Sequence, residues 1–334
     1  MQYLQSNPKF RHNLIFTYSD KPKEAYIVAS HSTFQVSQKD AQEFLKIRSF
    51  CTGYNEISAI SEKSGISTKK INKILQSLYD ADMFRRPARN LTLIDKSEIV
   101  NQLLVLSKMW GKQLEETYIA ADLNAGDSTK NSLIGWLFET YHYIKNFPQA
   151  IWTAYKYAAD TELKNVYAEY YRQEQGHEKF ILECLIRLGF KQDEIVNSIP
   201  LVATRLICLM MDELFKYCPE SLLLIANIIE SNEDSTLDDF RSFRLSLEKK
   251  YSLPDGSLIA LQKHSELDYQ LGHASLAKKH EKFLYNITCE KIHILINLIH
   301  DIKHAFDAQS MEIKEYYNQV GNYIPRQPVD YFSI

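Results

Sequence analysis

The chain has 334 residues, enough for two domains, and its fractions of apolar and charged residues are those of an ordinary globular protein. Its 39 basic and 42 acidic residues give a net charge of −3, so no overall field favours nucleic acid or an anionic membrane. The five scattered cysteines form no Cys-x-x-Cys pair, and neither a signal core nor a membrane-length apolar run is present, so we expect a cytoplasmic protein with reduced thiols.

The first 90 residues predict a small α+β domain. Three short segments favour strands because they alternate or are rich in β-branched residues: 14–18, 25–30 and 32–37. Three helical patterns follow, at 40–50, 55–65 and 67–84, and Gly65 separates the last two as in a helix-turn-helix. Helical periodicity stops in the segment 84–93, which contains Pro87. We therefore expect a linker there and a domain boundary at residue 90.

The second domain, 91–334, is predicted to be a helical bundle. Apolar residues recur there with helical spacing, and few Gly or Pro residues interrupt them. The predicted helices are 97–121, 130–157, 161–189, 199–214, 219–232, 236–250, 255–281 and 284–318. The fold class expected for the whole chain is therefore mainly α, with a small α+β domain in front of the bundle.

Ionisable residues lie one or two at a time inside the apolar and aromatic stretches of these predicted helices. An unpaired charge inside a bundle is costly, so a bound cation is the natural explanation for them. Carboxylates and imidazoles without cysteine suit iron or manganese better than a structural zinc site. The candidates are Glu139, Glu174, His177, Glu230, Asp268 and His273.

Two Glu-x-x-His pairs occur, a spacing that puts both side chains on one face of a helix and is used by ferritin-like di-iron bundles. In the pair Glu174 and His177 both residues are candidate ligands. In the second pair we favour Glu139 as a ligand, because an apolar and aromatic segment surrounds it. For His142 we favour a hydrogen-bonded or partly exposed histidine.

The segment 264–273 offers several further ligands. His264 and Asp268 are four residues apart and share a helix face. Asp268 and His273 are five apart, about 140° around an ideal helix. They converge only if the helix is locally widened or unwound, which Gly272 would ease. His264, His142 and Glu266 remain possible alternative metal ligands, or residues that contact the ligands. Glu230 ends an apolar run, where a carboxylate that faces water is the alternative.

With these motifs, residues 130–310 resemble the haem-oxygenase-like di-iron oxidases and the wider group that contains pyrroloquinoline-quinone synthase and thiaminase-II-like proteins. The matching segments, in the family's order, are WLFETYHYI, RQEQGHEKFILECLIRLGF, CPESLLLIANIIES and HSELDYQLGHASLA. The resemblance implies two ferrous ions, with manganese as the alternative metal and dioxygen as co-substrate. It implies six ligands: Glu139, Glu174, His177, Glu230, Asp268 and His273. Some family members have a histidine where this chain has Leu271, so His273 or His264 must take that role.

Residues 13–86 resemble the winged-helix precursor-peptide recognition element of peptide-modifying pathways. In such domains a leader peptide adds as a strand beside the sheet and against the third helix. The resemblance implies that this surface contains Thr33, Phe34, Val36, Lys70, Lys73 and Ile74. Packing or oligomer formation, and DNA binding through the lysines, are the alternatives, and the net negative charge argues against DNA.

These expectations together describe an iron-dependent oxygenase or oxidase that modifies an amino-acid residue within a ribosomally made precursor peptide, as in natural product biosynthesis. The alternatives are a small-molecule oxidase of the same fold, a metal-free member of that fold, and a winged-helix regulator with a helical sensor domain. The expected partners are the leader peptide and a second copy in a homodimer. Nucleic acid and membrane are not expected.

Overall fold

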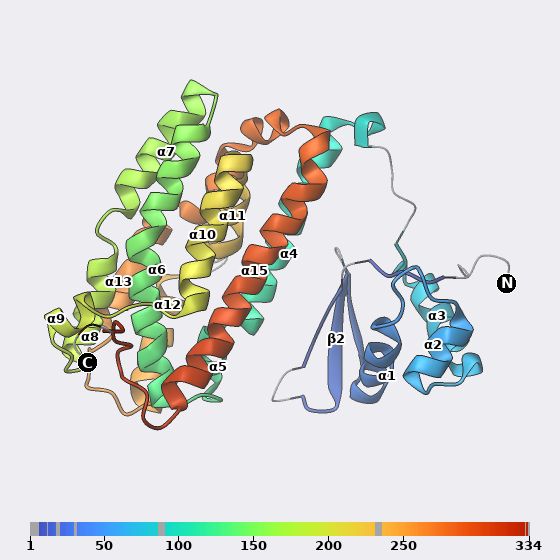
Figure 1. Ribbon diagram of the computed structural model, residues 1–334, viewed down its shortest axis with the longest axis horizontal. Coiled ribbons are helices and arrows are strands. Elements are labelled where there is room, and N and C mark those ends of the chain that lie inside the picture. Colours follow the sequence, from blue (N-terminus) through green and yellow to red (C-terminus); the bar gives the residue numbers. More distant parts are fainter. Residues whose placement is uncertain are drawn as a thin grey trace. The chain divides into compact units, whose positions relative to one another are not determined.

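The chain divides into two compact units, Met1–Leu93 and Ile94–Ile334, each with a hydrophobic core of its own (Figure 1). The computed structural model describes residues 7–11, 13–17, 21–29, 32–85, 91–230, 236–330 and 332. The division lies close to the boundary expected at residue 90. Half of the expected linker, 86–90 with Pro87, lies outside the described residues.

The N-terminal unit has the three strands and three helices that the sequence predicts. Its antiparallel sheet has the order β1-β2-β3, with β1 at Leu14–Phe16, β2 at Glu24–Ala29 and β3 at Ser32–Ser37. The helices are α1 (Gln38–Arg48), α2 (Ile57–Ser64) and α3 (Thr68–Asp80). Within the described residues β3 pairs with β2 alone, so it is an edge strand whose outer backbone groups are open to a further strand.

Alternation along β2 builds the core of this unit. Ala25, Ile27 and Ala29 are buried, and the last two belong to a core that also contains Phe44 of α1 and Ile71 of α3. The intervening residues of β2 are half-buried. One face of the sheet therefore covers the helices, as period-two patterning requires.

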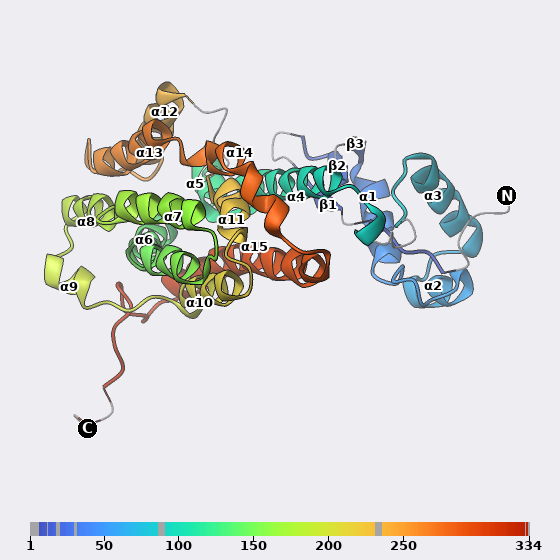
Figure 2. The ribbon, with the colours of Figure 1, turned by 90° about the horizontal axis from the view of Figure 1, so that it is seen from above.

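The second unit is helical. Its α-helices are α4 (Lys96–Thr117), α5 (Ile119–Ala125), α6 (Lys130–Tyr157), α7 (Thr161–Glu174), α8 (Glu178–Arg187), α9 (Gln192–Val196), α10 (Val202–Tyr217), α11 (Ser221–Ile229), α12 (Leu237–Lys250), α13 (Ile259–Leu271), α14 (Leu276–Lys279) and α15 (Cys289–Asn318). Two short 3-10 turns, η2 (His273–Ser275) and η3 (Glu281–Asn286), lie beside α14. Helix α6 packs against α7, α8, α10 and α15, and the ribbon seen from above shows α8 and α7 on one side of it (Figure 2).

Close packing fixes how α6 meets α15. Gly135 of α6 faces the ring of Tyr317, and a Cβ at Gly135 would lie 2.3 Å from Cδ2 of that ring. Both residues border a core that includes Leu133, Leu137 and Phe138, which are fully buried. A larger residue at Gly135 would push the two helices apart.

Three helices that the sequence predicts as continuous are broken. The segment 161–189 is two helices, because α7 ends at Glu174 and the chain turns through Gly176 at φ +91°. The segment 97–121 breaks at Tyr118, which is extended, and 255–281 breaks at Gly272, which is left-handed. Amphipathic periodicity continues across the breaks at Tyr118 and Gly176, which is why the pattern did not reveal them, whereas the spacing of Asp268 and His273 had pointed to unwinding near Gly272.

The longest helices, α6 and α15, have 28 and 30 residues, and charged side chains interrupt both. Across the described part of the chain, no helix combines the length and apolar character needed to cross a membrane. The length of α6 and α15 instead serves the bundle, since their buried faces carry much of its core.

Candidate metal centre

Six ionisable side chains, four from the ends of helices or the turns after them and two from within α13, meet inside the helical unit. Glu174 is the last residue of α7, and His177 follows the turn at Gly176. Glu230 caps the end of α11. His264 and Asp268 lie in α13, and His273 opens the 3-10 turn η2 that follows it.

These residues form two adjoining groups, His177–His264–Asp268 and Glu174–Glu230–His273. In each group one potential ligand atom per residue lies within 4.8 Å of the others. The groups are also in contact with each other. Nδ1 of His177 lies 3.4 Å from Oε2 of Glu174, and Nδ1 of His273 lies 3.6 Å from Oδ1 of Asp268. The arrangement therefore resembles one centre for two ions more than two separate sites.

Several atoms of this centre are buried without a hydrogen-bond partner among the described residues: Nδ1 of His177, Nε2 of His264, Nδ1 of His273 and Oδ1 of Asp268. The contacts between these histidines and carboxylates have ion-pair distances but not hydrogen-bond geometry. A buried polar atom without a partner costs about 1–3 kcal/mol. Lone pairs of nitrogen and oxygen that converge on a shared space are what a divalent cation requires, so these residues fit a metal pair.

Electrostatics inside the centre also favours a cation. Burial, together with Glu174, raises the pKa of Glu230. Burial and then the carboxylates of Glu230 and Glu174 raise the pKa of Asp268. Burial and the two neighbouring imidazoles lower the pKa of His264 to about 3, so it is a neutral ligand at physiological pH. Two positive ions would remove the repulsion between the carboxylates.

Local unwinding brings His273 to Asp268, as the sequence predicts. Helix α13 ends at Leu271, and Gly272 adopts the left-handed conformation at φ +72°. His273 then points back into the centre, and its Nε2 lies 3.2 Å from Oε1 of Gln173. This contact leaves Nδ1 facing Glu174, at 3.2 Å from Oε1. Helix α13 thus ends in a glycine C-cap and is not locally widened around Asp268.

Glu139 lies outside the centre, in contrast to the expectation from sequence. Its Oε2 accepts hydrogen bonds from the backbone N–H of Leu201 at 2.9 Å and from Oγ1 of Thr204 at 2.5 Å. Its Oε1 accepts from the hydroxyl of Tyr317 at 3.0 Å. Burial raises its pKa to about 7, although these three donors oppose the rise. Glu139 therefore joins α6, α10 and α15, and His264 takes its place as the sixth candidate ligand.

The other two alternative residues also lie outside the two groups. His142 is buried, and its Nε2 lies 2.9 Å from the hydroxyl of Ser198, so the hydrogen-bonded interpretation holds. Oε1 of Glu266 accepts a hydrogen bond of 2.6 Å from Gln262. Each has a protein partner, and neither belongs to the candidate groups within the described residues.

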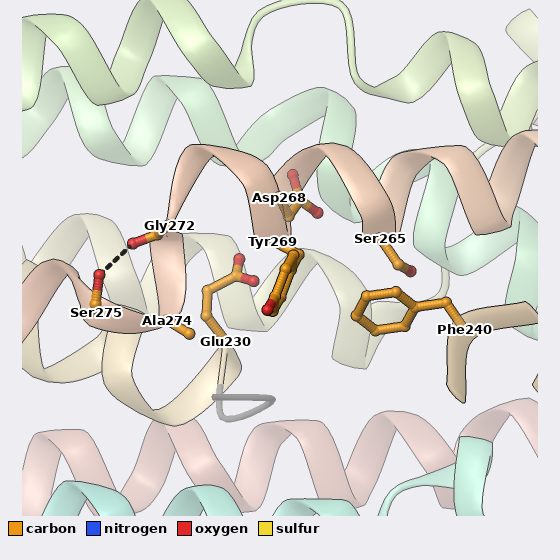
Figure 3. Close-up of a pocket in the computed structure, with 8 residues that line it drawn as sticks. All are labelled: Glu230, Phe240, Ser265, Asp268, Tyr269, Gly272, Ala274 and Ser275. Carbon is orange, nitrogen blue, oxygen red and sulfur yellow. Dashed lines mark hydrogen bonds between the residues drawn. The ribbon is translucent and has the colours of Figure 1, made fainter. Parts of the chain in front are cut away.

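Two cavities reach the centre. The main cavity, of about 580 Å³, is walled mostly by aromatic and aliphatic side chains, among them Trp136, Tyr143, Phe243 and Phe306. The small cavity, of about 190 Å³, is drawn in Figure 3 and opens beside Tyr269, Ala274 and Ser275. Glu230 and Asp268 line both, and in Figure 3 the carboxylate of Glu230 points toward helix α13, which carries Asp268. Both cavities thus give access to the candidate ligands.

Sequence reasoning missed two tyrosines beside the centre. Tyr143 of α6 and Tyr170 of α7 have buried hydroxyls without a hydrogen-bond partner among the described residues. Each lies four residues from a glutamate, Glu139 or Glu174, and so shares its helix face. Tyrosines are common in the bundle core, so this spacing alone did not distinguish them.

The residues expected to bind a leader peptide lie on β3 and α3 of the N-terminal unit. Thr33 is exposed, while Phe34 and Val36 are half-buried against the core. On α3, Lys73 is exposed and Ile74 is half-buried. Lys70 forms an ion pair with Glu43 of α1.

No protein-family model matches the chain, and no curated protein matches it. Among solved structures it is similar to a domain of unknown function with a haem oxygenase-like fold from Shewanella denitrificans OS217. The two are 18% identical with a TM-score of 0.51, over 67% of this chain and 94% of the other. Identity this low shows the fold alone. The chain therefore has a haem oxygenase-like helical fold, preceded by a small α+β unit, and the fold class predicted from the sequence is confirmed.

Proposed function

We propose that the helical unit is a non-haem oxidase or oxygenase with two metal ions, iron foremost and manganese as the alternative. The observation that carries this proposal is the pair of adjoining ligand groups, His177–His264–Asp268 and Glu174–Glu230–His273, with four buried atoms that have no hydrogen-bond partner among the described residues. All ligand atoms are nitrogen or oxygen, which suits iron and manganese. A haem oxygenase-like fold includes enzymes, and the resemblance of the motifs to di-iron oxidases supports the same conclusion.

Two ferrous ions at this place would supply the capacity to activate dioxygen. The protein's own part is to hold and enclose the reacting groups. Glu174, Glu230 and Asp268 set the charge, and Gln173 holds the ring of His273. The aromatic and aliphatic wall of the main cavity suits an apolar or aromatic side chain of a substrate.

We further propose that the substrate is an amino-acid residue in a precursor peptide held by the N-terminal unit. The open edge of β3 supports this, because an added strand would gain backbone hydrogen bonds there. Half-buried Phe34 and Val36 offer apolar contacts beside that edge. A tethered leader would raise the effective concentration of the core peptide at the metal centre without tight contacts to it.

The direct test is metal content after anaerobic loading of the full-length protein with ferrous iron. We expect about two irons per chain, since six ligands suffice for two open-coordinated ions. His264→Ala and His177→Ala should each lose at least one iron, and reduced protein should consume dioxygen. The matched control is His142→Ala, which removes a buried histidine outside the centre and should leave the metal content unchanged. Normal stoichiometry in the His264 and His177 variants would contradict the site.

A further inference from the structure

Tyr143 of α6 has a buried hydroxyl that finds no partner in the described part of the chain. Leaving such a group unsatisfied costs about 1–3 kcal/mol, so a native structure usually provides something for it to bind. Tyr167, by comparison, is buried and donates a hydrogen bond of 2.7 Å to the carbonyl of Pro219. The difference calls for a partner of Tyr143 that the described residues do not supply.

The position of Tyr143 shows where that partner would be. Tyr143 lines the main cavity together with Glu174 and Glu230 of the candidate centre. Burial, then Cys208, Glu230 and Glu174, raise its pKa well above the ordinary value. The phenol is therefore a neutral O–H donor beside the candidate ligands.

The aromatic ring is held firmly, so its hydroxyl has little freedom to seek another partner. It stacks on Phe147 with ring centroids 5.6 Å apart and an interplanar angle of 27°. The edge contact with Phe306 has a centroid distance of 5.5 Å and an angle of 74°. Since rings packed on two sides lose most of their rotamer freedom, the partner must come to the hydroxyl through the cavity.

We propose that Tyr143 contacts the exogenous ligand of the centre: its hydroxyl donates a hydrogen bond to an oxygen or nitrogen atom of a small molecule or substrate group bound beside the metal pair. This inference rests on the proposed metal centre and goes beyond it, because it assigns ligand recognition to a residue of α6 that binds no metal. The ligand class is an acceptor small enough to fit between the phenol and the carboxylates of Glu174 and Glu230.

Tyr170 provides a matched comparison. Its hydroxyl is also buried without a partner in the described part of the chain, and its ring makes an edge contact with His273 at a centroid distance of 4.9 Å. It does not, however, line either of the two cavities described above. Loss of its hydroxyl should therefore leave ligand binding nearly unchanged, although the chemical change, removal of one hydroxyl from a ring that is kept, is the same as for Tyr143.

The test is a titration with azide, a small anionic acceptor, of full-length protein loaded with iron and oxidised, followed by visible absorbance. Wild type, Tyr143→Phe, Tyr170→Phe and Tyr167→Phe should all carry the same amount of iron. We expect azide to bind about 10–100-fold more weakly to Tyr143→Phe, as for one lost hydrogen bond to a charged group, and within about twofold of wild type in both control variants.

Three results would overturn the inference. Azide binding by Tyr143→Phe within twofold of wild type would show that the hydroxyl does not contact the ligand. Equal weakening in Tyr170→Phe would show a general effect of the packing. A phenolate-to-iron absorption band in wild type that disappears in Tyr143→Phe would make Tyr143 a metal ligand instead. Wild-type protein that takes up no iron would contradict the proposed function itself, and the present inference with it.

Discussion

Replacement of Glu139 by glutamine tests whether this carboxylate has a structural role or is a metal ligand. Glu139→Gln can keep the hydrogen bonds from the N–H of Leu201 and the hydroxyl of Thr204 through its amide oxygen, and its amide nitrogen can donate to the oxygen of Tyr317. The hydroxyl hydrogen of Tyr317 loses its acceptor, which costs about 1 kcal/mol. The variant should therefore fold and bind the same amount of iron as wild type.

The same substitution should change how stability depends on pH. Burial raises the pKa of Glu139 from its ordinary 4.5 to about 7, so the folded state binds a proton that the unfolded state has released between these values. The stability that this proton contributes is fully present below pH 4.5 and is lost as pH rises through about 7. At 1.36 kcal/mol per pH unit the loss amounts to about 3 kcal/mol.

The measurement is urea unfolding of metal-free wild type and Glu139→Gln at pH 5, 6, 7 and 8. Because all other titrating groups are common to both proteins, the difference between them isolates this carboxyl. The free energy of unfolding of Glu139→Gln should rise relative to that of wild type as pH rises. By pH 8 the variant should be more stable by about 2 kcal/mol, after the lost hydrogen bond is counted. Parallel pH profiles would refute the reasoning, and loss of iron from the variant would restore Glu139 as a ligand.

Three further substitutions test other parts of the structure. Gly135→Ala should destabilise the helical unit by about 1–3 kcal/mol, because its methyl group meets an aromatic ring of α15, and an unchanged melting temperature would contradict that packing. Gln173→Ala should weaken iron binding about 10–100-fold by freeing the ring of His273, as measured by competition with a chelator, and an unaltered affinity would show that the contact does not orient the ligand. Lys73→Glu on α3 should weaken the binding of a leader peptide encoded near this gene, whereas Lys63→Glu on α2 should not, as followed by tyrosine fluorescence; equal effects would argue against the predicted surface.

The helices and strands were largely predictable because their signals are local. Alternation and β-branching identified β2 and β3. Apolar periodicity predicted α6 with the same bounds that the structure shows, Lys130–Tyr157. The breaks at Tyr118 and Gly176 were not predicted. The helices on both sides of each break pack on the same core, so the apolar residues keep their helical spacing across the turn. Gly272 was the exception, because two candidate ligands on opposite sides of an ideal helix required unwinding there.

The candidate ligands were harder to predict, because the position of one helix along its axis relative to its neighbours depends on tertiary packing. Glu139 and Tyr143 lie on one face of α6 but are about 6 Å apart along its axis, at 1.5 Å per residue. The sequence shows that this face is buried but not which turn of it meets Glu174. His264, four residues before Asp268, was recognisable as sharing its face, but only the folded chain shows that it lies closer to the centre than Glu139 does.

Four of the six candidate ligands end or follow helices: Glu174, His177, Glu230 and His273. Terminal turns are the parts of helices that open most easily, because their last carbonyls lack intrahelical partners. Binding of metal would therefore fasten the ends of α7, α11 and α13 to one another. Amide hydrogen exchange should slow at these three ends on metal loading while the middle of α6 stays unchanged. A chain built in this way would couple the acquisition of its cofactor to the final ordering of its interior.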